Sequence, residues 1–390
     1  MMVDFLWLLL PVAAASGWYG AKQSLRKRPT IPLPIPHEYF AGLNYILNEQ
    51  PDRAIEVFSR LLQSDNPESI EIHIALGSLF RRRGEVDRAI RIHQTLVMDS
   101  RLSKEQRCLA LLELGHDYYR AGLLDRAEGL LKDLIELESN NEAALMLLGA
   151  VYQQEKEWEK AIAITEQLSY GNSHTKRTTL AQYYCELAAE AFTQRHCDEA
   201  LERLQQALTC DPACVRASIL QGDIHRYTHN FPAALISYQR VIEQDAEYLA
   251  EVIDGLIYSL EHLQRPEQIL DYLQTILRDH PCDKGAIVYS AMLSKQHSVR
   301  DAAVFIANAL NKTPSLTMLH RLAELGSVGA SGEFKDTFRV IRATLEQLLK
   351  QTPTYRCNHC GYGSKALYWL CPSCKTWASI KPRHDGGAEK

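Results

Sequence analysis

The chain has 390 residues, a formal net charge of −5 at pH 7 and 46% hydrophobic residues. This length and composition allow a sizeable buried core and more than one domain. The mild negative charge lacks the basic footprint of nucleic-acid-binding proteins, so nucleic acid is excluded as an expected partner.

Residues 1–21 are predicted to form a transmembrane anchor. An uncharged run, FLWLLLPVAAASGWYGA, extends from Phe5 to Ala21, and about 1.5 Å per residue brings it near the roughly 30 Å of a bilayer core. The alternative is a cleaved signal peptide, because AAAS resembles a cleavage site. The Lys and Arg residues follow the run instead of preceding it. This charge distribution favours an anchor whose N-terminus lies outside and whose body lies in the cytoplasm.

Residues 22–36 are predicted to be a basic, proline-rich linker. Prolines at positions 29, 32, 34 and 36 disfavour a helix and favour an extended polyproline conformation. The linker would hold the body a short distance from the membrane.

Residues 37–350 contain an internal repeat. A small or apolar residue recurs every 33 to 39 residues and is followed 12 residues later by Ala or Ile. The pairs are Gly42 and Ala54, Gly77 and Ala89, Gly115 and Ala127, Gly149 and Ala161, Ala188 and Ala200, Gly222 and Ala234, Ile257 and Ile269, and Ser290 and Ala302. The pattern resembles the tetratricopeptide repeat, a helix–turn–helix unit of about 34 residues.

The small residues at both positions predict that the two helices of each repeat approach closely. Pro212, Pro281 and Pro314 each stand where the second helix of a repeat should end. One repeat cannot bury its own apolar face, so neighbouring repeats must stack. We therefore predict an all-α solenoid of about nine units, with residues 315–350 as a degenerate capping unit.

The first helices of such repeats line a concave groove, and this groove is the predicted partner-binding surface. The pattern places seven basic and aromatic residues there: Arg81, Arg82, His116, Tyr119, Arg120, Arg226 and Tyr227. Gln153 falls at an equivalent position. Arginines among aromatics suit an acidic or polar peptide. The alternative for RRRGE, residues 81–85, is a solvated turn.

Residues 351–382 are predicted to be a small metal-binding module. Two C-x-x-C pairs are separated by ten residues, and their cysteines are Cys357, Cys360, Cys371 and Cys374. Each pair directs two thiolates towards one point, and four thiolates bind one tetrahedral metal ion. The spacing does not distinguish iron from zinc. A pair of disulfides is the alternative, which a cytoplasmic location disfavours.

The knuckles resemble those of rubredoxins and zinc ribbons, with a shortened separation between the pairs. All four ligand positions are Cys, so the metal is expected to be structural or at most redox-active. Four aromatics of the module, Tyr362, Tyr368, Trp369 and Trp377, are expected to pack against the final repeats of the solenoid. The alternative is an independent ribbon that presents them to a partner. Residues 383–390 form a tail without a recognisable motif.

The other six cysteines are scattered through helical sequence without a disulfide framework, which indicates buried thiols in a reducing compartment. No phosphate-binding loop, H-E-x-x-H motif or G-x-S-x-G motif occurs in the sequence. Nothing brings a nucleophile together with a base, so the chain is predicted not to be an enzyme.

The order of anchor, proline-rich linker, repeats and terminal four-cysteine module resembles the lipopolysaccharide assembly protein B family of Gram-negative bacteria, over essentially the whole chain. The resemblance implies a single-pass inner-membrane protein with a periplasmic N-terminus and a cytoplasmic body. It also implies an adaptor that promotes degradation of the lipid A pathway deacetylase by a membrane-bound AAA+ metalloprotease. An inner-membrane regulator that senses lipopolysaccharide is the third implied partner.

Three alternatives remain at the level of sequence. The first is a rubredoxin-like electron carrier on a repeat scaffold. The second is a general membrane-tethered scaffold for lipopolysaccharide enzymes. The third, a nucleic-acid-binding ribbon, has few basic residues to support it, and a membrane tether suits it poorly.

Overall fold

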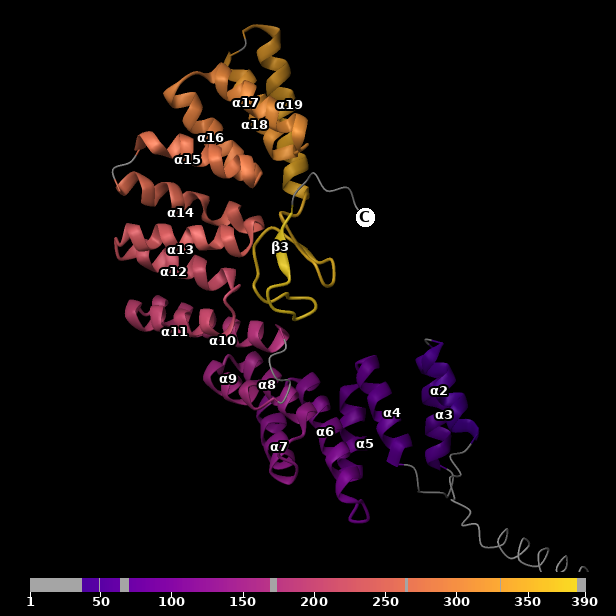
Figure 1. Cartoon of the computed structure of the whole chain (residues 1–390). Helices are drawn as coiled ribbons and strands as arrows, with labels where there is room; N and C mark the ends of the chain where they lie inside the picture. The colour runs from indigo at the N-terminus through magenta and orange to yellow at the C-terminus, as the bar shows by residue number, and fades with distance from the viewer. Residues whose placement is uncertain are drawn as a thin grey trace, which may run out of the picture. The chain divides into compact units, whose positions relative to one another are not determined.

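The computed structural model describes residues 37–48, 50–63, 70–168, 174–263, 266–329 and 331–383. The described residues up to Gln351 are predominantly helical, and a small antiparallel sheet follows them (Figure 1). The chain divides into two compact units, Met1–Leu130 and Leu131–Lys390.

The predicted anchor (residues 1–21) and the predicted linker (residues 22–36) lie outside the described residues. Within the described ranges, no helix has both the length and the apolar content needed to cross a membrane. Of the predicted tail, only Arg383 is described.

The first unit consists of antiparallel helix pairs. Its helices are α2 (His37–Leu47), α3 (Pro51–Gln63), α4 (Ile70–Arg83), α5 (Val86–Val97), α6 (Lys104–Ala121) and the first part of α7 (Leu124–Leu137). The ends of α6 illustrate why helices form where they do. Ser103 and Gln106 form a reciprocal capping box at its start. Gly122 ends it in the left-handed conformation with φ 74°, which glycine adopts without a steric penalty.

The second unit continues the helix pairs and adds the terminal sheet. Its remaining helices are α8 (Glu142–Glu155), α9 (Trp158–Gln167), α10 (His174–Thr193), α11 (Cys197–Cys210), α12 (Val215–Tyr227), α13 (Phe231–Gln244), the 3₁₀ helix η2 (Ala246–Tyr248), α14 (Leu249–His262), α15 (Pro266–Asp279), α16 (Asp283–Gln296), α17 (Val299–Lys312), α18 (Leu316–Gly329) and α19 (Glu333–Gln351). As predicted, α11, α15 and α17 each end shortly before Pro212, Pro281 and Pro314. The described helices α2–α19 make nine pairs, which matches the expected tetratricopeptide solenoid.

Close helix approach explains the repeat signature. The residue 12 positions after each anchor is at most 1% exposed in all eight predicted pairs. A Cβ atom added to Gly42 would lie 2.6 Å from the Phe58 ring, and one added to Gly222 would lie 2.4 Å from Tyr238. Real Cβ atoms do not approach other atoms so closely, so a large side chain of the second helix occupies the space that the glycine leaves.

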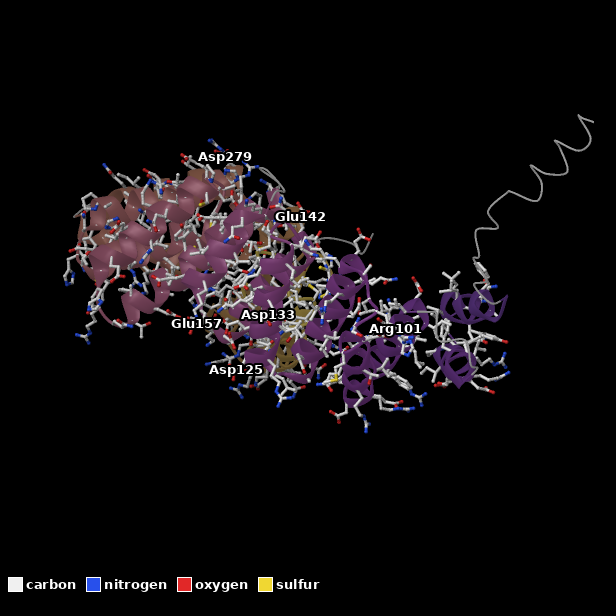
Figure 2. The ribbon with its side chains drawn as sticks, turned by 90° about the horizontal axis from the view of Figure 1, so that it is seen from below. Arg101, Asp125, Asp133, Glu142, Glu157 and Asp279 are labelled. Atoms are coloured by element: carbon white, nitrogen blue, oxygen red, sulfur yellow. The ribbon has the colours of Figure 1, made fainter. Side chains whose placement is uncertain are left out.

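Charged side chains cover the outside of the helices. In the second unit Asp133 of α7, Asp279 of α15 and Glu157, the residue before α9, are exposed (Figure 2). These charged side chains keep the surface of the helices solvated.

The terminal sheet has three strands, β1 (Tyr355–Cys357), β2 (Gly363–Ser364) and β3 (Ile380–Pro382), in the order β2-β1-β3. Both pairings are antiparallel, and Cys357 lies opposite Ile380. The core of this module is minimal: Cys357, Cys371 and Ile380 are its fully buried residues in the described structure. So small a core does not fold without additional stabilisation.

Candidate metal centre and its docking surface

The first cysteine pair lies in a tight turn at the end of β1. The N–H of Gly361 donates to the carbonyl of Cys357 at 2.9 Å, and the N–H of Cys357 donates to the carbonyl of Tyr362 at 2.8 Å. Gly361 has φ 77°, a conformation that costs glycine little. The turn brings Cys360 back towards Cys357.

The second cysteine pair repeats this geometry. The N–H of Lys375 donates to the carbonyl of Cys371 at 2.9 Å, and the N–H of Cys371 donates to the carbonyl of Thr376 at 3.1 Å. The residue after this pair, Lys375, has φ 56°. A non-glycine residue in the left-handed region is uncommon. Because the same turn occurs at both pairs, we infer that this backbone conformation is needed to direct the two thiols of each pair towards one point.

The four sulfur atoms converge on one point. All lie within 4.8 Å of one another. The Sγ atoms of Cys357 and Cys374 are 3.7 Å apart, and so are those of Cys360 and Cys371. Four thiolates around one ion with metal–sulfur bonds of about 2.3 Å lie roughly 3.8 Å apart. The donor set and its spacing therefore fit one four-cysteine metal ion, and the predicted ligands form a single site.

Neighbouring hydroxyl groups favour the thiolate form. The Thr376 hydroxyl oxygen lies 3.4 Å from Cys374 Sγ, and the Ser379 hydroxyl oxygen lies 3.3 Å from Cys357 Sγ. The interaction with Thr376 is the largest contribution that lowers the pKa of Cys374, to about 5. Metal ions bind thiolates, so these hydroxyls support the ligands from outside the coordination sphere.

Trp377 of the metal module packs against α8, α9 and α10 of the same unit. Its ring centroid lies 6.4 Å from Trp158 and 6.0 Å from Tyr183, both edge-on. Its indole Nε1 donates to Gln153 Oε1 at 2.9 Å, and the Tyr183 hydroxyl donates to the same oxygen at 3.0 Å. Gln153 is one of the predicted groove positions, so the module covers at least this position of the predicted groove.

Trp369 makes the second aromatic anchor. Its ring stacks on Tyr248 at a centroid distance of 5.7 Å and an interplanar angle of 17°. The guanidinium carbon of Arg216 lies 5.8 Å from the Trp369 centroid, within the range of a cation–π interaction. Leu367 and Trp369 also join the apolar core formed by helices α12–α14.

Polar contacts complete the interface between the module and the solenoid. The Tyr248 hydroxyl donates to the Ile380 carbonyl at 3.0 Å, and the Tyr355 hydroxyl donates to Glu251 at 2.7 Å. Lys381 Nζ lies 2.7 Å from Asp245 and 2.9 Å from Glu247. Burial lowers the pKa of Lys381, but the hydrogen bonds to both carboxylates outweigh it, and the net shift is upward.

The expected packing of four aromatics is half correct. Trp369 and Trp377 pack against the solenoid, whereas Tyr362 and Tyr368 are 38% and 45% exposed, so the prediction is wrong for these two. The expected position on the final repeats is also wrong, because the contacts fall on α8–α10 and α12–α14. Figure 1 shows β3 beside α12–α14 of the second unit. The chain folds back after α19, which sequence periodicity cannot reveal.

Arg81, predicted to line the partner groove, is engaged within the first unit. Its guanidinium lies 2.6 Å from Glu113 and 2.8 Å from Asp117, and its side chain is 16% exposed. Asp117 is fully buried and also lies 2.5 Å from His93 Nδ1. Arg81 therefore ties α4 to α6, and its charge is satisfied inside the protein.

The other six predicted groove residues differ in accessibility. Arg82 and Arg120 are exposed, and His116 and Tyr119 are half-buried. Burial is the main cause that lowers the pKa of His116. In the second unit Arg226 forms a 3.5 Å ion pair with Asp223, and Tyr227 is 50% exposed.

Several residues of the docking surface were not predicted from the sequence. Tyr248, Glu251 and Asp245 lie near η2, at a junction between repeats. Their contacts join residues more than 100 positions apart. The repeat spacing gave no signal for them, because the connection between α13 and α14 has the same length as the connection between α11 and α12.

Family models match both parts of the chain. A model described as rubredoxin metal binding domain matches residues 355–382. A model described as tetratricopeptide repeat matches residues 41–96, 112–173 and 185–248. The structural assignment of solenoid and metal module agrees with both.

Two curated proteins are similar to this chain along its length. It is 35% identical over 383 residues to Lipopolysaccharide assembly protein B of Escherichia coli (strain K12), covering 98% of each chain. It is 34% identical over 390 residues to the protein of the same name from Haemophilus influenzae, again covering 98% of each. Among solved structures, a C-terminal part of a TPR repeat-containing protein from Cytophaga hutchinsonii aligns with a TM-score of 0.42 and 14% identity, over 68% of this chain and 98% of that one. MamA protein aligns with a TM-score of 0.34 and 22% identity, over 46% and 93%.

Proposed function

The chain belongs to the lipopolysaccharide assembly protein B family, and from this premise we propose that it is a membrane-anchored adaptor that controls lipopolysaccharide synthesis. In this proposal it delivers the lipid A pathway deacetylase to a membrane-bound AAA+ metalloprotease, and an inner-membrane lipopolysaccharide sensor opposes it. The similarity that carries the proposal covers 98% of the chain and includes both the repeats and the metal module.

The architecture supports binding over catalysis. A tetratricopeptide solenoid presents side chains along an extended surface, which suits peptide and protein partners. All four metal ligands are cysteines, and a coordination sphere filled by protein ligands leaves no position for a substrate. A bound metal ion would supply folding free energy to the small module. The residues around it, Trp369 and Trp377, would hold the module on the solenoid.

The exposed groove residues of the first unit are the proposed capture surface. Arg82 and Arg120 offer accessible guanidinium groups, and Tyr119 and His116 lie half-buried at neighbouring groove positions. Guanidinium groups bind carboxylates in a bidentate manner. An acidic segment of the deacetylase is therefore the partner chemistry that we propose. Arg81 is excluded from this surface because Glu113 and Asp117 already bind it.

We propose that residues 1–21 anchor the chain in the inner membrane with a periplasmic N-terminus and a cytoplasmic body. Tethering in the protease's own membrane raises the effective concentration of both proteins without new contacts. The capture surface then requires only modest affinity. A C-terminal alkaline phosphatase fusion should be inactive and a fluorescent protein fusion bright, and an active phosphatase would refute this orientation.

The adaptor role is tested by the lifetime of the deacetylase. Cells that depend on this chain are pulsed with a translation inhibitor, and deacetylase decay is followed by immunoblot. The Arg82→Glu, Arg120→Glu double variant should slow decay several-fold and lose the deacetylase from pull-downs of solubilised membranes. Arg195→Glu, an exposed arginine outside the predicted groove set, is the matched control and should behave as wild type. Normal decay in the double variant, at equal protein level, would refute this capture surface.

The electron-carrier alternative is favoured by one observation. Cys360 is exposed, so an iron ion in the site would have a short route to an external electron donor. Protein loaded with zinc alone distinguishes the two functions, because zinc undergoes no redox change. Full deacetylase turnover with zinc-loaded protein supports the adaptor, whereas turnover only with iron supports the electron carrier.

A further inference from the structure

Two cysteines that are not metal ligands lie next to each other inside the solenoid. Cys185 of α10 and Cys214, the residue before α12, are 0% and 4% exposed. Their sulfur atoms are 3.9 Å apart. This is van der Waals contact, and a disulfide requires an approach to about 2.05 Å.

The surroundings of Cys214 favour a thiolate. It occupies the N-cap position of α12, a helix of 13 residues, where backbone N–H groups stabilise negative charge. Gln182 Nε2 lies 3.6 Å from Cys214 Sγ and Cys185 Sγ lies 3.9 Å from it. Two side chains and a helix terminus thus converge on this sulfur.

Arg216 places a positive charge beside the pair. It is 7% exposed, and its Nε has no hydrogen-bond partner among the described residues. Its Nη1 lies 2.9 Å from Glu186 and 3.3 Å from Gln182. The positive charge of Arg216 is among the contributions that lower the pKa of Cys214.

The pKa shifts of the two thiols point in opposite directions. The hydrogen bond with Cys185 is the largest cause that lowers the pKa of Cys214. Burial is the largest cause that raises the pKa of Cys185. A thiol of lowered pKa beside a thiol of raised pKa is the pairing of an attacking and a resolving cysteine.

We propose that Cys214 and Cys185 form a peroxide-responsive thiol pair that closes to a disulfide. The Cys214 thiolate attacks one oxygen of hydrogen peroxide, so an S–O bond forms, the O–O bond breaks, and hydroxide leaves and is protonated to water. The Cys185 sulfur then attacks the Cys214 sulfenic acid. The S–S bond forms and the S–O bond breaks, and the departing hydroxide takes the Cys185 proton. Two thiols are oxidised by two electrons, and one peroxide is reduced to two waters.

The pair communicates with the docked metal module through Arg216. The same guanidinium that lies beside the pair stands 5.8 Å from the Trp369 ring. Closing the disulfide replaces the 3.9 Å contact between the two sulfurs with a covalent bond and draws the start of α12 towards α10. The position of Arg216, two residues after Cys214, and hence its contact with Trp369, therefore depends on the oxidation state. In a reducing compartment such disulfides are transient and serve as sensors.

The test uses the full-length, metal-loaded protein. It is treated with hydrogen peroxide at one to five equivalents, quenched, denatured, alkylated and digested for mass spectrometry. We expect a disulfide-linked peptide pair that contains Cys185 and Cys214. The Cys185→Ser variant should lack that pair and accumulate sulfenic acid at Cys214, trapped by dimedone at least several-fold above wild type. Tryptophan emission should change on oxidation of wild type but not of Cys185→Ser.

Cys282→Ser is the matched control, because Cys282 is also buried (8% exposed) and also precedes a helix. It should leave the Cys185–Cys214 disulfide unchanged. If a variant folds poorly, the presence or absence of the disulfide-linked peptide pair in the wild-type protein still tests the proposal. Oxidation confined to the four metal ligands, a Cys210–Cys214 disulfide, or equal dimedone labelling in wild type and Cys185→Ser would each overturn the proposal.

Discussion

Arg81 and Arg82 are adjacent in sequence, and the structure assigns them opposite roles. Arg81 lies against Glu113 and Asp117 with a side chain that is 16% exposed, whereas Arg82 is exposed to solvent. Arg81→Glu would place a third carboxylate beside two existing ones. Arg82→Glu would change only the charge of the surface. The pair of variants therefore separates a structural arginine from a candidate binding arginine.

The expected loss of folding stability follows from the burial of the ion pairs that Arg81 makes. Removing one partner of a buried ion pair costs about 3–5 kcal/mol, since the remaining charge is left uncompensated. Arg81 retains some exposure, so we take about 3 kcal/mol for Arg81→Glu. A surface substitution such as Arg82→Glu changes stability by no more than about 0.5 kcal/mol. For a unit of this size, about 3 kcal/mol lowers the melting temperature by more than about 10 °C.

The assay combines thermal unfolding by circular dichroism with native-state hydrogen exchange. Hydrogen exchange assigns the loss to individual helices, because stability is not uniform along a repeat protein. Arg81→Glu should accelerate exchange in α4–α6 and leave α12–α14 unchanged. Arg82→Glu should match wild type in both measurements. If both variants melt alike, or if Arg81→Glu unfolds nothing, then the buried network does not stabilise the first unit.

The pH dependence of the first unit should reflect Glu113. Burial raises its pKa, but the hydrogen bond and charge of Arg81 lower it further, so the folded value lies below the ordinary one. Glu113 then stabilises the fold above the ordinary pKa of about 4.3, and this contribution is lost as pH falls through the lower folded value. Between pH 6 and 3, the melting temperature of the wild type should therefore fall more steeply than that of Arg81→Met. Equal slopes for the two proteins would contradict this prediction. Cys371→Ser should reduce the metal content, measured by elemental analysis, from one ion per chain to none, while the helical circular dichroism remains. A variant that keeps its metal would show that the four sulfurs do not bind one ion together. Trp377→Ala should weaken docking of the metal module by about 3 kcal/mol, which would be measured as faster tryptic cleavage within residues 352–383. The control variant Tyr368→Ala should not accelerate cleavage, because Tyr368 is already 45% exposed. Equal cleavage of the two variants would show that Trp377 does not hold the module on the solenoid.

The sequence by itself determined the repeat architecture. Each repeat has a small or apolar residue where two helices meet and Ala or Ile 12 positions later, and both are local requirements of helix packing. Gly42 and Ala54 are separated by a short stretch of chain, so their relationship is visible as a spacing. The same holds for the metal ligands, because each C-x-x-C turn prepares two of the four thiolates before any distant contact forms.

Only the tertiary structure decided where the metal module lies and which arginines are accessible. Trp377 and Gln153 are 224 residues apart, and Tyr248 and Ile380 are 132 apart. No periodic pattern encodes such pairs, since they depend on how the chain folds back after α19. Arg81 and Arg82 are the same residue type at adjacent positions of one repeat, and they differ in whether carboxylates of α6 face them. The exposure of a charged side chain is set by the neighbouring repeat, and a spacing within one repeat does not contain that information.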